Sequence, residues 1–293
     1  MIKNIAVIGA GTMGNGIAHV FARYNFNVTL IDTNEAALGK AVQTIAQNAD
    51  RQVSKGIITQ ATKDRILLTI HTSTSIATGV ANSDLAIEAA TENKAVKLNI
   101  FKQLDDLTPP AAILASNTSS ISITAIAAAT KRPEKVIGMH FMNPVPVMQL
   151  VEVINGYATA KEVTNNIVHI ARQLDKIPCI VNDYPGFIAN RILMPMINEA
   201  IHSLYERVAG IEEIDTVMKL GMAHPMGPLQ LADFIGLDVC LSILKVLYEG
   251  FGNPKYAPCA LLVNMVAAGK LGIKSGEGFY KYTPGSKELL PAF

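Results

Sequence analysis

The segment Ile5-Ala6-Val7-Ile8-Gly9-Ala10-Gly11-Thr12-Met13-Gly14 decides the fold. Its four leading apolar residues are typical of a strand buried on both faces, and an apolar helical pattern begins at Ile17. In a dinucleotide site Gly9 allows the tight turn, Gly11 lets the backbone approach a pyrophosphate, and Gly14 lets helix and strand pack closely. The anion then lies at the positive N-terminal end of the helix. By themselves, such glycines often serve packing only.

A second strand and an acid favour the dinucleotide interpretation. The run Asn27–Ile31 reads as a strand and is followed by Asp32, where an NAD site places the carboxylate that binds the ribose diol. Thr33 and Asn34 follow, and no Arg is offered to a 2′-phosphate, so NAD is favoured over NADP. The alternative is a turn or helix-capping role for Asp32. The predicted cofactor-binding residues are Gly9, Ala10, Gly11, Thr12, Met13, Gly14 and Asp32.

Composition excludes several classes of protein. The chain has 293 residues with 25 Lys+Arg, 24 Asp+Glu and 49% apolar residues, which is not the composition of a disordered chain. The near-neutral charge argues against nucleic acid or an anionic membrane surface as a partner. The chain has two long stretches without Asp, Glu, Lys or Arg. Both are interrupted by polar residues and prolines, so neither predicts a membrane span. The three cysteines have no metal-ligand spacing, and no metal site is predicted. We expect a cytoplasmic protein without a leader peptide.

The remaining chain has two different patterns of expected secondary structure. Helix and strand patterns alternate up to about residue 183, which predicts an α/β domain with a mostly parallel, Rossmann-like sheet. After Asp183-Tyr184-Pro185-Gly186 only helices are expected, so the predicted domains are 1–184 and 185–293. The expected helices of the second domain are Phe187–Tyr205, Ile211–Leu220, Asp238–Tyr248 and Cys259–Ala268. Its apolar surplus predicts burial against a second copy, that is, a homodimer.

A histidine and a glutamate form the candidate catalytic pair. His140 ends an apolar strand, and ligands gather at the carboxyl ends of strands in open α/β sheets. Glu152 lies between Val151 and Val153, where a carboxylate needs a partner. If the two strands are neighbours, the acid can fix the imidazole tautomer and raise its basicity. On spacing alone, a structural core contact is an equal alternative.

The segment Ser116-Asn117-Thr118-Ser119-Ser120 follows the expected strand Ala111–Ala115. These small polar side chains can bind a ligand, or they can form a turn that caps the next helix. Ser119 has no Gly-x-Ser-x-Gly elbow around it, which argues against a serine hydrolase.

Taken together, these motifs resemble the L-3-hydroxyacyl-CoA dehydrogenase family, most closely its short-chain bacterial members that act on 3-hydroxybutyryl-CoA. The resemblance covers nearly the whole chain. It rests on the glycine segment, Ser116–Ser120, His140-Phe141-Met142-Asn143-Pro144, Pro185-Gly186-Phe187-Ile188-Ala189-Asn190-Arg191, His224-Pro225-Met226-Gly227-Pro228 and Lys274-Ser275-Gly276-Glu277-Gly278-Phe279-Tyr280.

The resemblance implies roles for the matching residues. His140 would be the general base on the substrate 3-hydroxyl, and Glu152 would orient it. Ser119 and Asn190 would hold substrate oxygens. The implied cofactor contacts are Glu92, Lys97, Asn117, Ser119, Asn143 and Lys274. The family fold implies a Rossmann-like domain joined to a helical domain that forms the dimer.

Two departures from the family pattern leave more than one substrate class possible. Many bacterial relatives carry Asn where this chain has Ala223, which removes one polar contact to the substrate. The long helix offers only Lys40, Arg51 and Lys55 to coenzyme A phosphates, of which Arg51 and Lys55 are the candidates. The alternatives are therefore a dehydrogenase of a free hydroxy acid such as L-gulonate, and a dinucleotide-binding protein without enzymatic activity.

Overall fold

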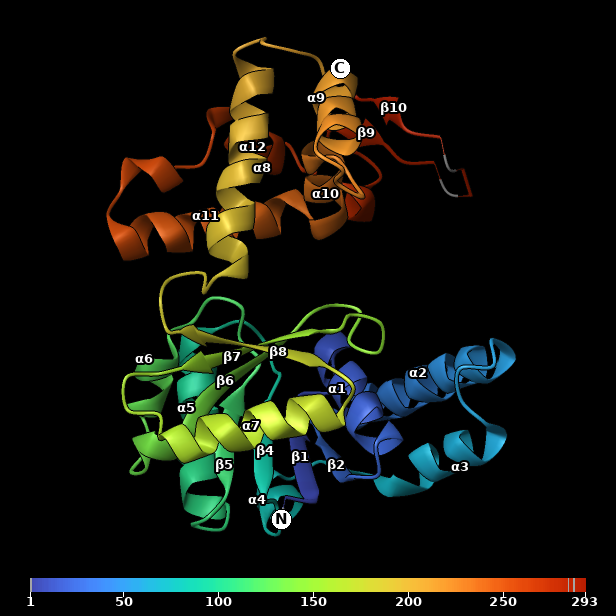
Figure 1. Ribbon diagram of the computed structural model, residues 1–293, viewed down its shortest axis with the longest axis vertical. Coiled ribbons are helices and arrows are strands. Elements are labelled where there is room, and N and C mark those ends of the chain that lie inside the picture. Colours follow the sequence, from blue (N-terminus) through green and yellow to red (C-terminus); the bar gives the residue numbers. More distant parts are fainter. Residues whose placement is uncertain (1, 284, 287) are drawn as a thin grey trace. The chain divides into compact units, whose positions relative to one another are not determined.

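The structure is a computed structural model that describes residues 2–283, 285–286 and 288–293. The chain divides into two compact units, Met1–Tyr184 and Pro185–Phe293 (Figure 1). Each unit has its own cluster of buried apolar side chains. Since each unit buries its own core, each has the character of a domain.

The first unit is built on an eight-stranded sheet of order β3-β2-β1-β4-β5-β6-β7-β8. All neighbouring strands pair in parallel except β6 and β7, which are antiparallel. This confirms the predicted mostly parallel Rossmann-like sheet. The strands are β1 (Asn4–Ile8), β2 (Asn27–Ile31), β3 (Ile70–Ser73), β4 (Leu85–Glu88), β5 (Ile113–Ser116), β6 (Val136–Phe141), β7 (Leu150–Asn155) and β8 (Ile177–Asn182).

Helices accompany the strands as the alternating pattern predicts (Figure 1). Alternate strand residues, from Ile5 and Val7 on β1 to Val151 and Val153 on β7, bury one sheet face against apolar residues of α1 and α7. Asparagine side chains cap two of the helices: Asn34 accepts bonds at the start of α2, and Asn93 at the start of α5. The helices are α1 (Thr12–Arg23), α2 (Glu35–Ser54), α3 (Gln60–Thr69), α4 (Ile76–Val80), α5 (Lys94–Leu107), α6 (Ile123–Ala127) and α7 (Lys161–Gln173), with a 3-10 turn η1 (Pro133–Lys135).

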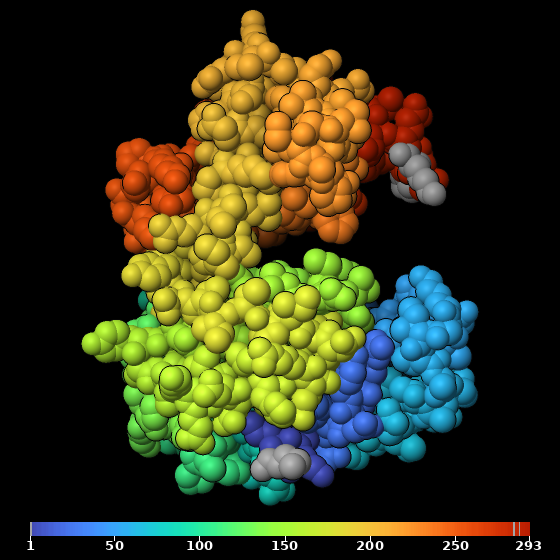
Figure 2. Space-filling model, in the orientation of Figure 1, coloured from blue at the N-terminus to red at the C-terminus, as the bar shows by residue number. Residues whose placement is uncertain are grey.

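The sequence patterns do not predict α3, β3 and α4. In α3 only Ile66 is fully buried, so the helix has too narrow an apolar stripe to be recognised. Strand β3 is an edge strand with two exposed residues among four. Helices α2 and α3 pack on each other beside the sheet (Figure 1), and they form the light-blue part of the surface in Figure 2.

The second unit is helical, as expected. Its helices are α8 (Ala189–Tyr205), α9 (Ile211–Thr216), η2 (Val217–Gly221), α10 (Pro228–Ile235), α11 (Leu237–Phe251), η3 (Pro254–Tyr256), α12 (Ala260–Ala267) and η4 (Ile273–Ser275). Helix α10 is an addition to the expected set. The unit is not all-helical, because the two-residue strands β9 (Tyr280–Lys281) and β10 (Leu290–Pro291) pair antiparallel.

Two buried carboxylates organise this second unit. Asp215 accepts the N–H groups of Leu229 and Gln230 in the first turn of α10, together with the hydroxyl of Tyr280. Asp233 accepts the N–H groups of Phe279 and Tyr280. Each carboxylate therefore satisfies backbone donors that burial would otherwise leave unpaired.

The described residues offer neither a membrane-spanning helix nor a metal-binding cluster. None of the helices is both long and apolar enough to cross a membrane. Within the same residues, no group of three or more His, Cys, Asp or Glu side chains is placed to hold a metal ion.

Candidate active site

The glycine turn between β1 and α1 has the geometry that a dinucleotide needs. Gly9 has φ +107°, which disfavours any side chain, and its N–H donates to the Ile31 carbonyl at 2.7 Å. A Cβ at Gly14 would lie 1.7 Å from the Gly9 carbonyl oxygen, so the helix can approach the turn only without one. A Cβ at Gly11 would meet no protein atom within 4 Å. The protein therefore does not need glycine at Gly11 for its own packing, and the open space suits a ligand.

Asp32 joins the end of β2 to the glycine turn. Its Oδ2 accepts the Ala10 N–H at 2.8 Å, and its Oδ1 accepts the Asn34 N–H at 2.9 Å. Asn34, not Asp32, caps α2. The turn role considered for Asp32 from the sequence is thus present in the structure, and the carboxylate remains half-exposed beside the turn.

The residues at this turn fit a dinucleotide. Helix α1 begins at Thr12. Its N-cap residue is Gly11, which has no side chain that could accept hydrogen bonds from the first N–H groups of the helix. These groups and the positive end of the helix attract a pyrophosphate, and the Gly11 space admits it. When such a ligand binds, residues from Gly9 to Gly14 would hold its phosphates.

A cavity of about 390 Å³ opens beside the turn. It lies between α1, α2 and the loop that joins β6 to β7. Its lining consists of Ala10, Gly11, Thr12, Asn15, Gly16, Ala37, Lys40, Ala41, Thr44, Asn48, Asn143, Pro144, Val145 and Pro146. The segment expected to bind the cofactor and the segment that follows His140 therefore border one cavity, although Gly11 and Val145 lie 134 positions apart in the sequence.

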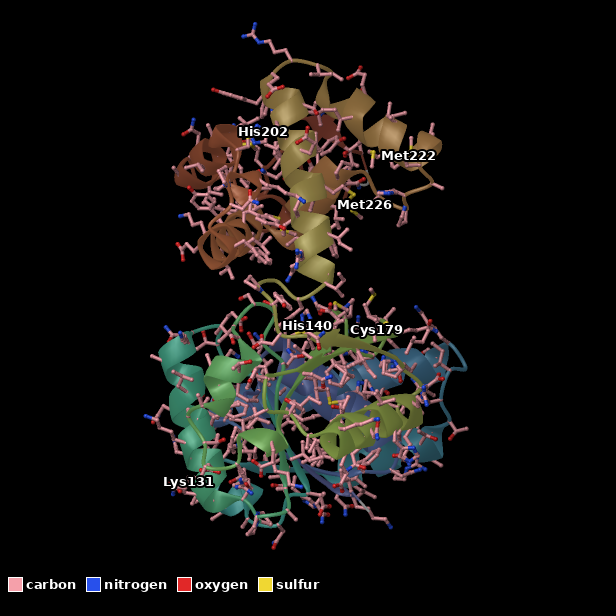
Figure 3. The ribbon with its side chains drawn as sticks, turned by 60° about the vertical axis from the view of Figure 1, so that its left-hand side comes forward. Lys131, His140, Cys179, His202, Met222 and Met226 are labelled. Atoms are coloured by element: carbon pink, nitrogen blue, oxygen red, sulfur yellow. The ribbon has the colours of Figure 1, made fainter. Side chains whose placement is uncertain are left out.

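His140 and Glu152 lie opposite each other on the antiparallel strands β6 and β7. His140 Nδ1 is 2.7 Å from Glu152 Oε2, and the two residues are 8% and 0% exposed. His140 is the residue before the last of β6, and Figure 3 shows it at the opposite end of its unit from Lys131. The sequence analysis allowed a contact between His140 and Glu152 only if their strands are neighbours, and β6 and β7 are neighbours in the sheet.

Asn117 connects the polar segment to the histidine strand. Its Oδ1 accepts the N–H of Phe141, the residue after His140, at 2.9 Å, and its own N–H donates to the Glu88 carbonyl. Asn117 is buried, whereas Ser119 and Ser120 are half-buried. Asn117 thus has a structural task that the sequence did not predict, beside the cofactor contact implied by the resemblance.

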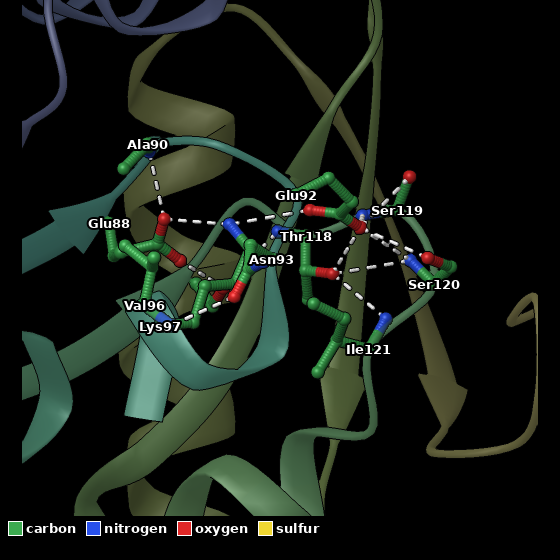
Figure 4. Close-up of polar contacts among 11 residues, drawn as sticks. Glu88, Ala90, Glu92, Asn93, Val96, Lys97, Thr118, Ser119, Ser120 and Ile121 are labelled. Carbon is green, nitrogen blue, oxygen red and sulfur yellow. Dashed lines mark hydrogen bonds and ion pairs between the residues drawn. The ribbon is translucent and has the colours of Figure 1, made fainter. Parts of the chain in front are cut away.

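Glu92 gathers the segment that carries Ser119 (Figure 4). Its Oε1 accepts the Thr118 hydroxyl at 2.6 Å, and both the N–H and the hydroxyl of Ser119 at 2.9 and 3.2 Å. Burial raises the pKa of the Glu92 carboxyl, but the Lys97 ammonium and the bonds from Thr118, Ser119 and Ser120 outweigh it, so the pKa lies below its usual value.

A buried ion pair stands behind Glu92. Lys97 Nζ lies 2.7 Å from Glu88 Oε1 and 3.3 Å from Glu92 Oε2, and the Lys97 side chain is only 1% exposed. Glu88 also accepts the Ser116 hydroxyl at 2.7 Å and the Ala90 N–H at 2.8 Å. Sequence reasoning missed Glu88, although an acid that ends the apolar run Leu85–Ile87 is the same signal that singled out Glu152.

Four more predicted site residues belong to α2 or to the second unit. Arg51 is in the last turn of α2 and Lys55 is its C-cap; both are exposed. Asn190 and Lys274 belong to the second unit. Asn190 is in the first turn of α8, and Lys274 forms an ion pair with Asp238. Ala223, the departure from the family pattern, has φ +56°, a left-handed conformation that Asn tolerates better than Ala.

Comparisons with known proteins agree with this architecture. The sequence matches a family described as "3-hydroxyacyl-CoA dehydrogenase, NAD binding domain" over residues 4–184, and "3-hydroxyacyl-CoA dehydrogenase, C-terminal domain" over residues 186–282. The two matched ranges together span most of the chain.

Relatives match over almost their full length. A probable 3-hydroxybutyryl-CoA dehydrogenase of Bacillus subtilis is 52% identical over 281 residues, which is 96% of this chain and 98% of the relative. The human mitochondrial hydroxyacyl-coenzyme A dehydrogenase is 44% identical, and the matched region is 96% of this chain and 92% of the relative. The crystal structure of (S)-3-hydroxybutyryl-CoA dehydrogenase from Ralstonia eutropha superposes with a TM-score of 0.94 at 50% identity. The match covers 97% of this chain and 100% of that chain. The chain therefore belongs to the 3-hydroxyacyl-CoA dehydrogenase family and is an oxidoreductase that uses a nicotinamide dinucleotide.

Proposed function

We propose that this protein interconverts a short-chain L-3-hydroxyacyl-CoA, 3-hydroxybutyryl-CoA in particular, and the 3-oxoacyl-CoA, with NAD as cofactor and His140 as general base. The observation that carries the proposal is the contact of 2.7 Å between His140 Nδ1 and Glu152 Oε2 near the carboxyl end of β6. The substrate is suggested by the names of the relatives from Bacillus subtilis and Ralstonia eutropha.

His140 moves the proton in this proposal. Glu152 is fully buried and accepts the bond from Nδ1–H, so the lone pair of the neutral imidazole lies on Nε2. In the oxidative direction Nε2 takes the proton of the 3-hydroxyl, and in the reductive direction the imidazolium returns it. The bound nicotinamide supplies the hydride chemistry at C3. Glu152 stabilises the imidazolium while its own charge is retained.

Ser119 and Asn190 are proposed to hold the substrate oxygens. The Ser119 segment is held at the carboxyl end of β5 by the Glu92 bonds, which favours a fixed position for its hydroxyl. The proposed cofactor contacts are Gly9 to Gly14, Asp32, Glu92, Asn117, Ser119, Asn143 and Lys274. Lys97 is proposed to act through Glu92, because its ammonium is buried against Glu88 and Glu92.

One face of α2 supports a coenzyme A thioester as substrate. Lys40, Thr44 and Asn48 line the cavity at a spacing of four residues, and Arg51 and Lys55 continue the same face. Two exposed cations at the end of this polar face are suited to the phosphates of a coenzyme A whose thioester end enters the cavity. The preference for NAD rests on Asp32, followed by neutral residues instead of a cation for a 2′-phosphate.

A substrate panel tests the reaction. Acetoacetyl-CoA with NADH should lower the nicotinamide absorbance, with NADPH much slower, and the free acids acetoacetate and L-gulonate inactive. Turnover of a free acid but not its thioester would move the function to hydroxy-acid oxidation. Tight NADH binding with no turnover across chain lengths would make this a binding protein.

A pair of histidine variants tests the base. His140→Gln should lower kcat by about two to four orders of magnitude, because a positioned general base contributes that much, while NADH affinity is retained. The control is His169→Gln, an exposed histidine on α7. A fully active His140→Gln protein would exclude His140 as the base.

The assembly and the compartment are proposals of the same kind. We propose a homodimer formed through the second unit, because Leu220, Met222 and Phe234 are 83%, 60% and 58% exposed there. Light scattering should give about twice the mass of 31.4 kDa, and a monomer would contradict it. We propose the cytoplasm because all three cysteines are free thiols.

A further inference from the structure

The loop between β6 and β7, residues 142–149, forms one wall of the cavity through Asn143 to Pro146. Pro144 and Pro146 have no N–H group, so this loop has few donors for its own carbonyls. Its internal bonds converge on one acceptor, since the N–H groups of Val147 and Met148 both donate to the Pro144 carbonyl, at 3.0 and 2.9 Å. Among the described residues, no N–H group of the loop donates to the Val145 or the Met148 carbonyl.

Lys176 supplies the donors for both carbonyls. Its Nζ donates to the Val145 carbonyl at 2.7 Å and to the Met148 carbonyl at 2.6 Å. The side chain extends from the residue before β8, 31 and 28 positions away in sequence from its two acceptors. The residue is only 8% exposed and does not line the cavity.

The backbone of Lys176 is itself firmly placed. Asp175 adopts the left-handed conformation with φ +56°, and the Lys176 N–H donates to the Ala171 carbonyl at 2.9 Å, which ends α7 in a Schellman motif. The next residue, Ile177, starts β8 and pairs with Leu150 of β7. The ammonium therefore projects from a helix end that the sheet holds in register.

Keeping a cation here has a cost. Burial and the positive charge of Arg23 lower the pKa of Lys176, and only the Asp175 carboxylate opposes them. Both acceptors are carbonyls rather than carboxylates, and the negative end of helix α7 gives modest further support. A methionine would occupy similar space without this cost, so what the ammonium adds is its hydrogen bonds to the loop.

We propose that Lys176 is a positioning residue, which fixes the 142–149 loop so that Asn143 and the cavity wall keep the geometry that turnover requires. Val145 transmits the restraint, because it packs against α1: a Cβ at Gly16 would lie 2.9 Å from Val145 Cβ. The loop also joins the two strands that carry His140 and Glu152. The kinetic part of this inference rests on the proposed function, whereas its structural part does not.

The test compares Lys176→Met with a matched control, Arg132→Met. Arg132 is another partly buried cation that donates to carbonyls, those of Leu104, Asp105, Thr108 and Pro109, but it caps α5 away from the cavity. In Lys176→Met the amides of Val147 and Met148 should exchange with deuterium at least about tenfold faster than in the native protein. With acetoacetyl-CoA and NADH, kcat should fall by about 10- to 100-fold, while the NADH dissociation constant changes less than about threefold. Arg132→Met should show neither change at a temperature where both variants are folded.

Several results would overturn the proposal: unchanged exchange in the loop, an unchanged kcat, or an equal kcat loss in Arg132→Met. If Lys176→Met does not fold, the same measurements on Lys176→Arg decide, since the guanidinium keeps the charge but displaces the donors. Native kcat and native loop exchange in that variant would refute the positioning role. If the native protein shows no turnover, the proposed function fails, and the exchange measurement still tests the contact between Lys176 and the loop.

Discussion

Acid should destabilise this protein through His19, a buried residue of α1. His19 is 0% exposed, and among the described residues neither ring nitrogen has a hydrogen-bond partner. Burial, reinforced by the positive charge of Arg23, lowers the pKa of His19 from 6.5 to about 4. The folded state thus holds a neutral imidazole at a pH where the unfolded chain binds a proton.

The sign and size of the effect follow from these two pKa values. Because the unfolded state binds more protons below about pH 6.5, the free energy of unfolding falls as the pH falls, until about pH 4. The loss at about pH 5 relative to about pH 7 is on the order of 2 kcal/mol, within a limit of about 3 kcal/mol for the whole shift.

The assay is urea unfolding followed by circular dichroism between about pH 7 and pH 5. His19→Met keeps the volume and removes the titration, so its stability should fall by about 2 kcal/mol less than that of the native protein. His169→Met, at an exposed site on α7, serves as the control and should follow the native protein. Parallel losses in the native protein and His19→Met would refute the reasoning.

Three further substitutions have defined outcomes. Glu88→Gln leaves the buried Lys97 ammonium without its main counter-charge, so thermal unfolding should show a loss of about 3 kcal/mol; a loss below about 1 kcal/mol would contradict the ion pair's role. Arg132→Met removes the donors that cap α5 and should cost about 2 kcal/mol in the same assay with native kcat. Ala223→Asn should stabilise the protein by about 0.5–1 kcal/mol, because Asn tolerates φ +56°; destabilisation in urea would argue against left-handed strain there.

Part of the candidate site could be predicted because its signals are local. Glu152 lies between two valines and His140 lies at the end of an apolar strand, so each violates the pattern of a buried strand and is recognisable from the sequence. Their contact needed one more fact, that β6 and β7 are antiparallel neighbours, which places His140 opposite Glu152. Asp32 was expected to face a ribose, and the structure adds its bonds to Ala10 and Asn34.

The sequence by itself determined the mostly parallel class of the first unit's sheet, the glycine turn and the family, because periodicity and glycine spacing act over a few residues and leave a readable pattern. The edge strand β3 and the strand order lay outside that pattern. Tertiary structure alone decided the partners of Glu88, Lys97 and Lys176. Each of these charged side chains forms its ion pair or hydrogen bonds with atoms that the fold brings close. The bond from Lys176 to the Val145 carbonyl illustrates this, since the two residues are 31 positions apart in the sequence. Burial makes such long-range pairing obligatory, since a charged group removed from water must find its partners wherever the fold places them.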